Sequence, residues 1–164
     1  MGRRGENTHI NQRRANLKNS RSKLERLLAA NFQNGAQLVT LTYSPELAAP
    51  SRGLAALQLN DWLRFVKKQQ GQLRYIRATE QAQDKGGYPV HRVVLILSEA
   101  FVPSLPTSWA YGHTRIEPIQ GIAPESLSGL LMAQALKNER VAVPCGRTWT
   151  PSLGLIRPGK ENST

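Results

Sequence analysis

The sequence predicts an α+β domain in which helices pack on one face of an antiparallel sheet, in a split βαβ-like arrangement. The order of the expected elements is the main reason: after an N-terminal helix, the chain reads as strand, helix, strand, strand, strand, helix. A Gly-rich turn between two apolar strands favours antiparallel pairing. The chain has 164 residues, of which 40% are hydrophobic, and this suits one domain with a buried core.

The first segment divides into an arm and a helix. We expect a flexible basic arm over residues 1–9, followed by a basic helix over residues 10–32. Leucines recur in the second half of this helix at roughly helical spacing, with Arg or Lys between them. The helix is the first element of a single domain over residues 10–158, and residues 159–164 form a loose tail.

The middle of the chain supplies most of the sheet. Residues 36–44 (AQLVTLTYS) are rich in branched and aromatic side chains and predict a buried strand. Residues 54–70 show the apolar spacing of an amphipathic helix. Residues 72–80 (QLRYIRATE) alternate as a half-buried strand should, and the turn at 84–88 (DKGGY) leads into another strand at 89–97 (PVHRVVLIL).

The last third is less regular. HTRIEPI, at residues 113–119, predicts a further strand. PESLSGLLMAQALKNE, at residues 124–139, predicts a helix that opens with Pro124 and Glu125. The remainder of the chain is expected to be irregular.

The charge balance indicates a polyanionic partner. Lys and Arg number 22 against 11 acidic residues, which gives a net charge of +11 and a pI near 10.5. Residues 1–26 carry eight of the basic residues against Glu6 and Glu25, a net of +6. Nucleic acid suits such a surplus better than a membrane does. A merely soluble basic protein is the alternative.

Cysteine usage and hydropathy indicate the compartment. Cys145 is the lone cysteine, which excludes an intramolecular disulfide and suits a reducing cytoplasm. No apolar run approaches the roughly 18 residues of a membrane span, and no apolar signal segment follows the basic start. We therefore expect a soluble cytoplasmic protein with no membrane partner.

Glu80 and His91 come closest to a metal-site pattern. Glu80 ends one expected strand and His91 begins the next, so the two side chains could face each other across a hairpin. A carboxylate and an imidazole together can hold Mg²⁺ or Mn²⁺. Val93 occupies the position, two residues on, where a second histidine would share the face of His91. The alternative is a Glu–His surface pair at the mouth of a hairpin.

Several segments, taken in order, resemble the replication-associated proteins of small phages and plasmids, the rolling-circle initiators of the HUH endonuclease superfamily. They extend from about residue 21 to 158 and read RSKLERLLAANF, LVTLTYS, LRYIRATE, YPVHRVVLIL, SWAYGHTRIEPI and RTWTPSLGLIRP. The W-x-Y-G-x-T pattern after the histidine strand is the most specific part of the series.

The resemblance implies a site and its chemistry. In that family an acid and two histidines on the following strand bind a divalent metal, and a tyrosine on a later helix attacks the phosphodiester. Glu80 matches the acid and His91 matches the first histidine, whereas Val93 stands in place of the second. The implied cofactor is therefore Mg²⁺ or Mn²⁺, weakly bound.

The nucleophile of that family has no counterpart. The expected helix at 124–139 contains no tyrosine. Lys137 matches the family lysine, but Ala133, four residues before it, stands where the nucleophile would be. Tyr88, the nearest tyrosine to the metal residues in the sequence, is the least implausible substitute. Loss of both the second histidine and the tyrosine predicts that nicking activity is gone.

Two surfaces are candidates for contact with nucleic acid. The N-terminal helix would contact backbone phosphates and so position the nucleic acid. Arginines of the sheet, together with a tryptophan of the tail, would contact single-stranded nucleic acid beside the face that carries the active site in that family. The candidate residues are Arg13, Arg14, Lys18, Arg21, Lys23, Arg77, Arg92, Arg115, Arg147 and Trp149.

The sequence thus predicts a DNA-binding protein derived from a rolling-circle initiator, encoded by a phage or plasmid of a bacterial or archaeal host. It would bind hairpin or single-stranded DNA, rather than RNA, in the replication or regulation of a mobile element, without nicking it. One alternative is an active metal-dependent nicking and joining endonuclease with an unusual nucleophile. Another is a protein-binding inhibitor or accessory factor of phage origin.

Overall fold

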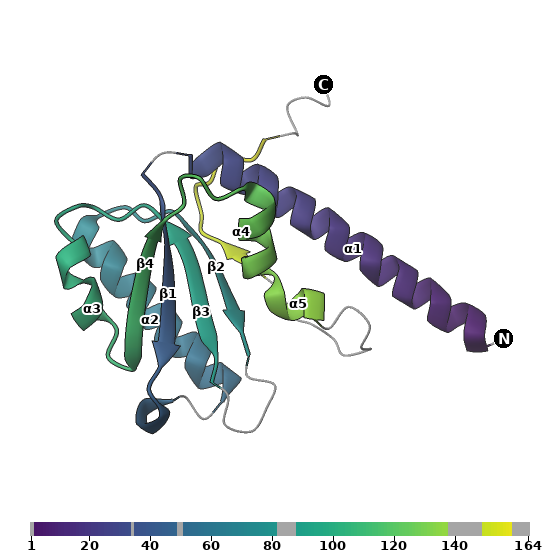
Figure 1. Ribbon diagram of the computed structural model, residues 1–164, viewed down its shortest axis with the longest axis horizontal. Coiled ribbons are helices and arrows are strands. Elements are labelled where there is room, and N and C mark those ends of the chain that lie inside the picture. The colour runs from purple at the N-terminus through teal and green to yellow at the C-terminus, as the bar shows by residue number, and fades with distance from the viewer. Residues whose placement is uncertain (1, 34, 49–50, 82–87, 138–148, 159–164) are drawn as a thin grey trace.

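The chain folds around one antiparallel sheet with helices on both of its faces (Figure 1). The computed structural model describes residues 2–33, 35–48, 51–81, 88–137 and 149–158. The sheet has five strands in the order β4-β1-β3-β2-β5. These strands are β1 (Gln37–Tyr43), β2 (Tyr75–Glu80), β3 (Val90–Leu95), β4 (Gly112–Pro118) and β5 (Thr150–Pro151). The helices are α1 (Gly2–Asn31), α2 (Arg52–Gln70), α3 (Leu105–Ser108), α4 (Pro124–Leu131) and α5 (Ala133–Lys137), with single 3₁₀ turns at Pro45–Leu47 and Val102–Ser104.

The predicted α+β class with an antiparallel sheet is confirmed, but the helices do not share one face. Strand residues alternate between two hydrophobic clusters. Leu41 and Val93 belong to the cluster that α2 covers. Leu38 and Val94 belong to the cluster that α1 and α4 cover. Because the central strands β1 and β3 are apolar on both sides, each face of the sheet requires its own helices.

The first helix begins earlier than expected. α1 starts at Gly2, so residues 2–9, predicted as a flexible arm, are helical. No apolar periodicity and no acidic residue in the first turn mark that start in the sequence. The leucine-rich second half is anchored by packing, and adding turns to an existing helix is far easier than nucleating one. This accounts for a helix that the local sequence does not predict.

Two further elements differ in detail. The helix expected at 124–139 is divided at Met132 into α4 and α5 within the described residues. The tail expected to be irregular adds the short strand β5 to the edge of β2. The turn at 84–87 and the tail at 159–164 lie outside the described residues.

Gly112 of the W-x-Y-G segment allows β4 to approach β1. A Cβ at this position would collide with the backbone of Thr42 and Tyr43. The atom nearest to such a Cβ is the carbonyl oxygen of Thr42. This oxygen also accepts a hydrogen bond from the indole Nε1 of Trp109, at 2.9 Å. The segment therefore fixes the edge of the sheet next to the strand that ends at Tyr43.

Candidate functional site

The pairing of β2 with β3 separates the two expected metal ligands. Thr79 lies opposite His91, and Glu80 lies opposite Val90. Neighbouring residues of a strand point to opposite faces, so Glu80 and His91 lie on opposite faces of the sheet. The carboxylate of Glu80 instead forms an ion pair with Arg92, at 2.8 Å. The expected meeting of Glu80 with His91 is therefore wrong, by a shift of one residue in the register.

His91 is the centre of a closed polar cluster on the α2 face, where its side chain is 0% exposed. Its Nε2 lies 2.9 Å from the hydroxyl of Tyr43, and its Nδ1 lies 2.7 Å from the hydroxyl of Thr79. The Tyr43 hydroxyl donates to Oε1 of Gln58, at 2.8 Å. We call these four residues (Tyr43, Gln58, Thr79 and His91) the His91 cluster.

The hydrogen bonds of the His91 cluster define its protonation. A phenol has one proton, so when Tyr43 donates to Gln58 it must accept from His91, which places the imidazole proton on Nε2. Nδ1 then accepts from Thr79. A metal ion binds an imidazole through a free lone pair, and Thr79 already occupies that of His91. In this arrangement His91 serves as a structural residue.

Burial shapes the acid–base properties of the cluster. Burial, followed by the nearby charge of Arg77, lowers the pKa of His91 to about 4. Burial, followed by repulsion from Tyr111, raises the pKa of Tyr43 to about 12. His91 is therefore neutral and Tyr43 protonated near pH 7. The rings of Trp109 and Tyr43 pack edge-on against each other, with centroids 5.4 Å apart, and help to enclose the imidazole.

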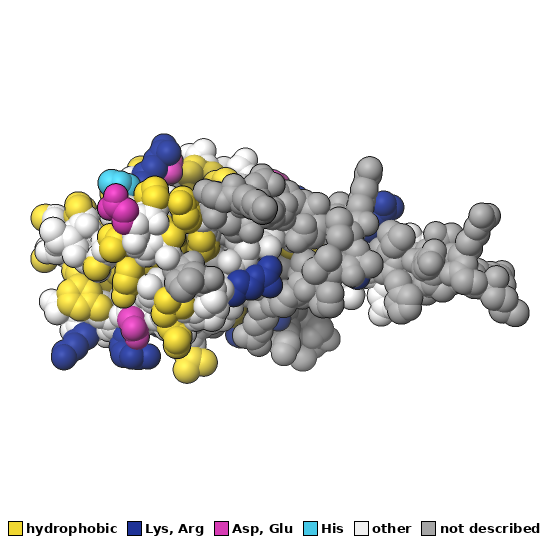
Figure 2. Space-filling view, turned by 90° about the horizontal axis from the view of Figure 1, so that it is seen from below, with side chains coloured by type: hydrophobic (Ala, Val, Ile, Leu, Met, Phe, Trp, Pro, Cys, Tyr) yellow, Lys and Arg dark blue, Asp and Glu magenta, His cyan; other side chains and the backbone are white. Residues whose placement is uncertain are grey.

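The surface over this end of the sheet carries little charge. β1 ends here, and Figure 2 views the end directly: much of its described surface is hydrophobic, with scattered charged side chains and no concentration of Lys and Arg. Leu47, which follows β1, and Tyr88, which precedes β3, are 50% and 37% exposed. Tyr88 is thus accessible, and Figure 2 shows no cluster of Lys and Arg side chains on the described surface visible at this end.

The helices expected to carry the nucleophile lie across the sheet from His91. α4 and α5 contribute Leu131 and Ala135 to the core shared with α1, whereas His91 faces α2. Ala133, at the place of the family tyrosine, begins α5. The side chain of Lys137 is outside the described part of the chain. These positions and His91 do not form one site.

Metal binding stays a prediction. Among the described residues, no three His, Cys, Asp or Glu side chains gather as a group that could hold a metal ion. Weak binding of Mg²⁺ or Mn²⁺ by Glu80 would have to compete with Arg92 for the same carboxylate. Its affinity is therefore expected to be low.

The predicted nucleic-acid contacts on the sheet are engaged within the protein. The guanidinium of Arg77 donates to Asn60 of α2, and Arg92 pairs with Glu80. Arg115 is well exposed but lies 3.3 Å from the carboxylate of Glu117. Arg147 and Cys145 lie outside the described residues.

Trp149 has a structural role. Its indole Nε1 donates to the hydroxyl of Ser20 in α1, at 2.9 Å, and the ring packs on the core beneath α1. The tail therefore ties down the first helix. Stacking of Trp149 on a base, as the sequence suggested, would require this contact to break.

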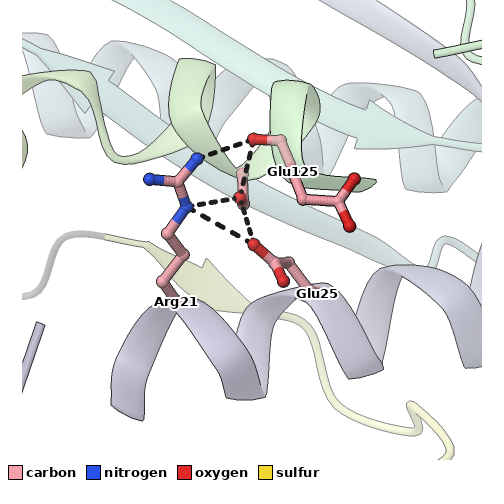
Figure 3. A network of polar contacts seen from close by, with 4 residues as sticks. Arg21, Glu25 and Glu125 are labelled. Atoms are coloured by element: carbon pink, nitrogen blue, oxygen red, sulfur yellow. Dashed lines mark hydrogen bonds and ion pairs between the residues drawn. The ribbon is translucent and has the colours of Figure 1, made fainter. Parts of the chain in front are cut away.

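Arg21 also connects parts of the fold (Figure 3). Its Nε donates to the hydroxyl of Ser128 at 3.0 Å, and its Nη2 donates to the carbonyl of Glu125 at 2.8 Å. Ser128 is fully buried and donates to the carboxylate of Glu25, at 2.8 Å. This network joins α1 to α4, so Arg21 is committed to packing rather than to an outside partner.

Several other basic residues in the described part of α1 are exposed to solvent. Lys18, Lys23 and Arg26 are exposed, as is Arg14, and Arg13 is half-buried. An outer stripe with intervals of three and four residues runs along the helix, opposite the leucines that pack on the sheet. Its members are Asn11, Ala15, Lys18, Ser22 and Arg26.

The sequence prediction missed several of these roles. Arg26 was not among the candidate contacts, although its spacing from Lys18 could have placed it on the same face. Thr79, Tyr43 and Gln58 had no sequence signal, because their meeting depends on strand register and on the position of α2.

No protein-family model, curated protein or solved structure matches this chain. The fold and the site together define an α+β protein with a hydrophobic core, a closed polar cluster around His91 and a long basic helix. Its resemblance to rolling-circle initiators rests on the sequence segments alone and stays a prediction. Within the described residues, no helix is both long and apolar enough to cross a membrane.

Proposed function

We propose that the protein binds DNA through the outward side of α1 and does not cleave it. The observation that carries this proposal is the exposure of Lys18, Lys23 and Arg26 on one long helix. Glu25 is the sole carboxylate of residues 11–31, and it is held by Arg21 and Ser128. Over residues 11–31, phosphates would therefore be attracted without a competing exposed carboxylate.

The absence of cleavage is inferred from the His91 cluster. A cleavage site of the initiator type needs an imidazole that can reach a metal beside a nucleophile. Here the lone pair of His91 is occupied by Thr79, and the hydroxyl of Tyr43 is buried with a raised pKa. Descent from a rolling-circle initiator is part of this proposal, as is a role in the cytoplasm of a bacterial or archaeal host, on hairpin or single-stranded DNA of a mobile element.

The two alternatives are separated by simple observations. A nicking enzyme with Tyr88 as nucleophile would become covalently attached to an oligonucleotide in Mg²⁺ or Mn²⁺, and Tyr88→Phe would abolish the adduct. Tyr88 is exposed, which is the one feature that favours this reading. A protein-binding inhibitor would show no salt-dependent affinity for DNA.

The test is a salt titration of DNA affinity for the triple variant Lys18→Gln, Lys23→Gln, Arg26→Gln. Each lost phosphate contact removes about 0.9 from the log–log salt slope on duplex and about 0.7 on single strands. We expect the slope to fall by about 2.7 on duplex and about 2.1 on single strands. Fluorescence anisotropy on duplex, hairpin and single-stranded probes gives both affinity and slope.

A matched control removes the same charge elsewhere. Arg52, Lys67 and Lys68 are exposed on α2, which covers the other face of the sheet. The triple variant Arg52→Gln, Lys67→Gln, Lys68→Gln should change the slope by much less than the α1 variant. Equal losses in both variants would show diffuse attraction by net charge, and an unchanged slope in the α1 variant would exclude α1 as the DNA-binding surface.

A further inference from the structure

The first half of α1 extends beyond the rest of the protein (Figure 1). Leu17 is the first described side chain of this helix that packs on the core. Before it, Asn11, Gln12 and Asn16 are exposed, as are Arg14 and Ala15. Successive residues are rotated by about 100°, so these five positions cover somewhat more than half of the helix circumference, an arc of about 200° from Arg14 to Asn16. Residues 2–16 therefore form a projecting rod, about 22 Å long at 1.5 Å per residue.

The exposed side chains of this rod have the chemistry of base recognition. Asn and Gln can donate to and accept from the edge of adenine in the major groove at the same time. Asn11, Gln12 and Asn16 are exposed on the rod, and Asn19 is exposed just beyond it. The cations Lys18 and Lys23 follow on the same helix, where they would reach phosphates.

The helix lacks the features that other partners need. A coiled-coil partner requires an apolar stripe, but Ile10 and Ala15 are the only Ala, Val, Leu, Ile, Met or aromatic residues between positions 2 and 16. Single strands are held mainly by stacking on aromatic rings, and residues 2–31 contain no Phe, Tyr or Trp, so α1 would contact a single strand through its phosphates and would not read its bases by stacking. The major groove of an RNA duplex is too narrow to admit a helix.

We propose that the projecting half of α1 enters the major groove of a DNA duplex and reads base edges with Asn11, Gln12 and Asn16. An α-helix with its side chains is about 10–12 Å wide, and the major groove of B-DNA is about 12 Å wide. The stem of a DNA hairpin offers the same groove. This inference rests on the proposed function, since it needs DNA binding by α1, and it adds sequence recognition in a double-stranded segment.

The experiment begins with selection of preferred sequences from a randomised duplex library by the full-length protein. The selected duplex and a scrambled duplex are then compared for the parent protein and for the variant Asn11→Ala, Gln12→Ala, Asn16→Ala. Alanine is a strong helix former, so the rod should stay helical, which circular dichroism checks. We expect the parent to prefer the selected duplex and the amide variant to lose at least tenfold of this preference, with an unchanged salt slope.

The cation variant Lys18→Gln, Lys23→Gln, Arg26→Gln serves as the counterpart. It should lose affinity for both duplexes equally and keep the ratio between them. A parent protein that binds DNA with a steep salt slope but selects no sequence would overturn groove reading and leave the proposed function intact. Preference that survives in the amide variant would also overturn it, and absence of any DNA binding would overturn both proposals.

Discussion

The His91 cluster and the outward side of α1 use polar residues in opposite ways. In the His91 cluster both imidazole nitrogens and the hydroxyls of Tyr43 and Thr79 are hydrogen-bonded within the protein, and the imidazole is 0% exposed. Lys18 and Lys23 on α1 are exposed to solvent instead. Among the described residues, no buried side-chain nitrogen or oxygen lacks a hydrogen-bond partner.

This difference separates folding from binding. A closed network stabilises the fold because each buried group would be costly if left unpaired. An exposed row of cations and amides gives almost nothing to stability and is available to a partner. The sequence predicted His91 as a metal ligand, but in the structure it is a buried residue of the core. The proposed function rests instead on the exposed residues of α1.

The largest effect is expected from His91→Ala. The substitution leaves a cavity and removes the partner of the Thr79 hydroxyl, so the free energy of unfolding should fall by about 3–5 kcal/mol. Chemical denaturation followed by circular dichroism measures it. Tyr88→Phe, at an exposed site, should change it by less than about 0.5 kcal/mol.

DNA affinity should not change in His91→Ala at a temperature where the variant is folded. A folded His91→Ala protein that binds DNA tenfold more weakly would show that the His91 cluster takes part in binding as well as in folding.

The stability of the protein should decrease at low pH because of His91. The unfolded chain takes up a proton at His91 near its ordinary pKa of about 6.5, whereas the folded protein does so only near pH 4. The unfolded state therefore binds more protons between these values, and stability falls as the pH falls through this window. At 1.36 kcal/mol per pKa unit, the loss from pH 7 to pH 4 is about 3 kcal/mol.

Denaturation curves of the parent and of His91→Gln, recorded across that range, isolate the contribution of this histidine. Carboxylates titrate in both proteins and cancel in the difference. If the free energy of unfolding changes with pH equally in the two proteins, His91 is solvated or already charged in the folded state. That result would contradict the closed His91 cluster.

The periodicity of apolar residues predicted the strands and helices that pack on the core, because burial of an element produces a regular apolar pattern in its sequence. β1 and β3 lie within one or two residues of their expected bounds. The register between β2 and β3 could not be predicted from the sequence. A shift of one residue decides whether Thr79 or Glu80 lies opposite His91, and the apolar pattern of the two strands did not distinguish these pairings. Thr79 rather than Glu80 therefore meets His91.

The roles of the basic residues of α1 were even less accessible from the sequence. Arg21 and Lys18 are three positions apart and both are basic residues, but only Arg21 contacts α4, whose Ser128 is 107 residues away in the chain. Which cations pack and which are exposed depends on that long-range contact. The composition shows that the helix is basic, but only the tertiary structure shows which of its cations pack against the fold and which are exposed.

The smallest expected effects come from substitutions of Arg21 and Lys18. The first should change mainly the stability of the protein, and the second mainly its DNA binding. Arg21→Gln removes the donors that reach Ser128 and the carbonyl of Glu125, so the free energy of unfolding should fall by about 1–2 kcal/mol, while the salt slope of DNA binding stays nearly unchanged. Lys18→Gln should leave stability within about 0.5 kcal/mol and lower the slope on duplex by about 0.9.

A double-mutant cycle of Arg21→Gln with Ser128→Ala tests whether the first loss comes from their contact. A coupling of at least about 0.5 kcal/mol is expected, because the two side chains are hydrogen-bonded and Ser128 is fully buried. Additive losses would place the contribution of Arg21 elsewhere. A slope that falls as much in Arg21→Gln as in Lys18→Gln would show that DNA can pull Arg21 out of its network, so that both residues would belong to the binding surface.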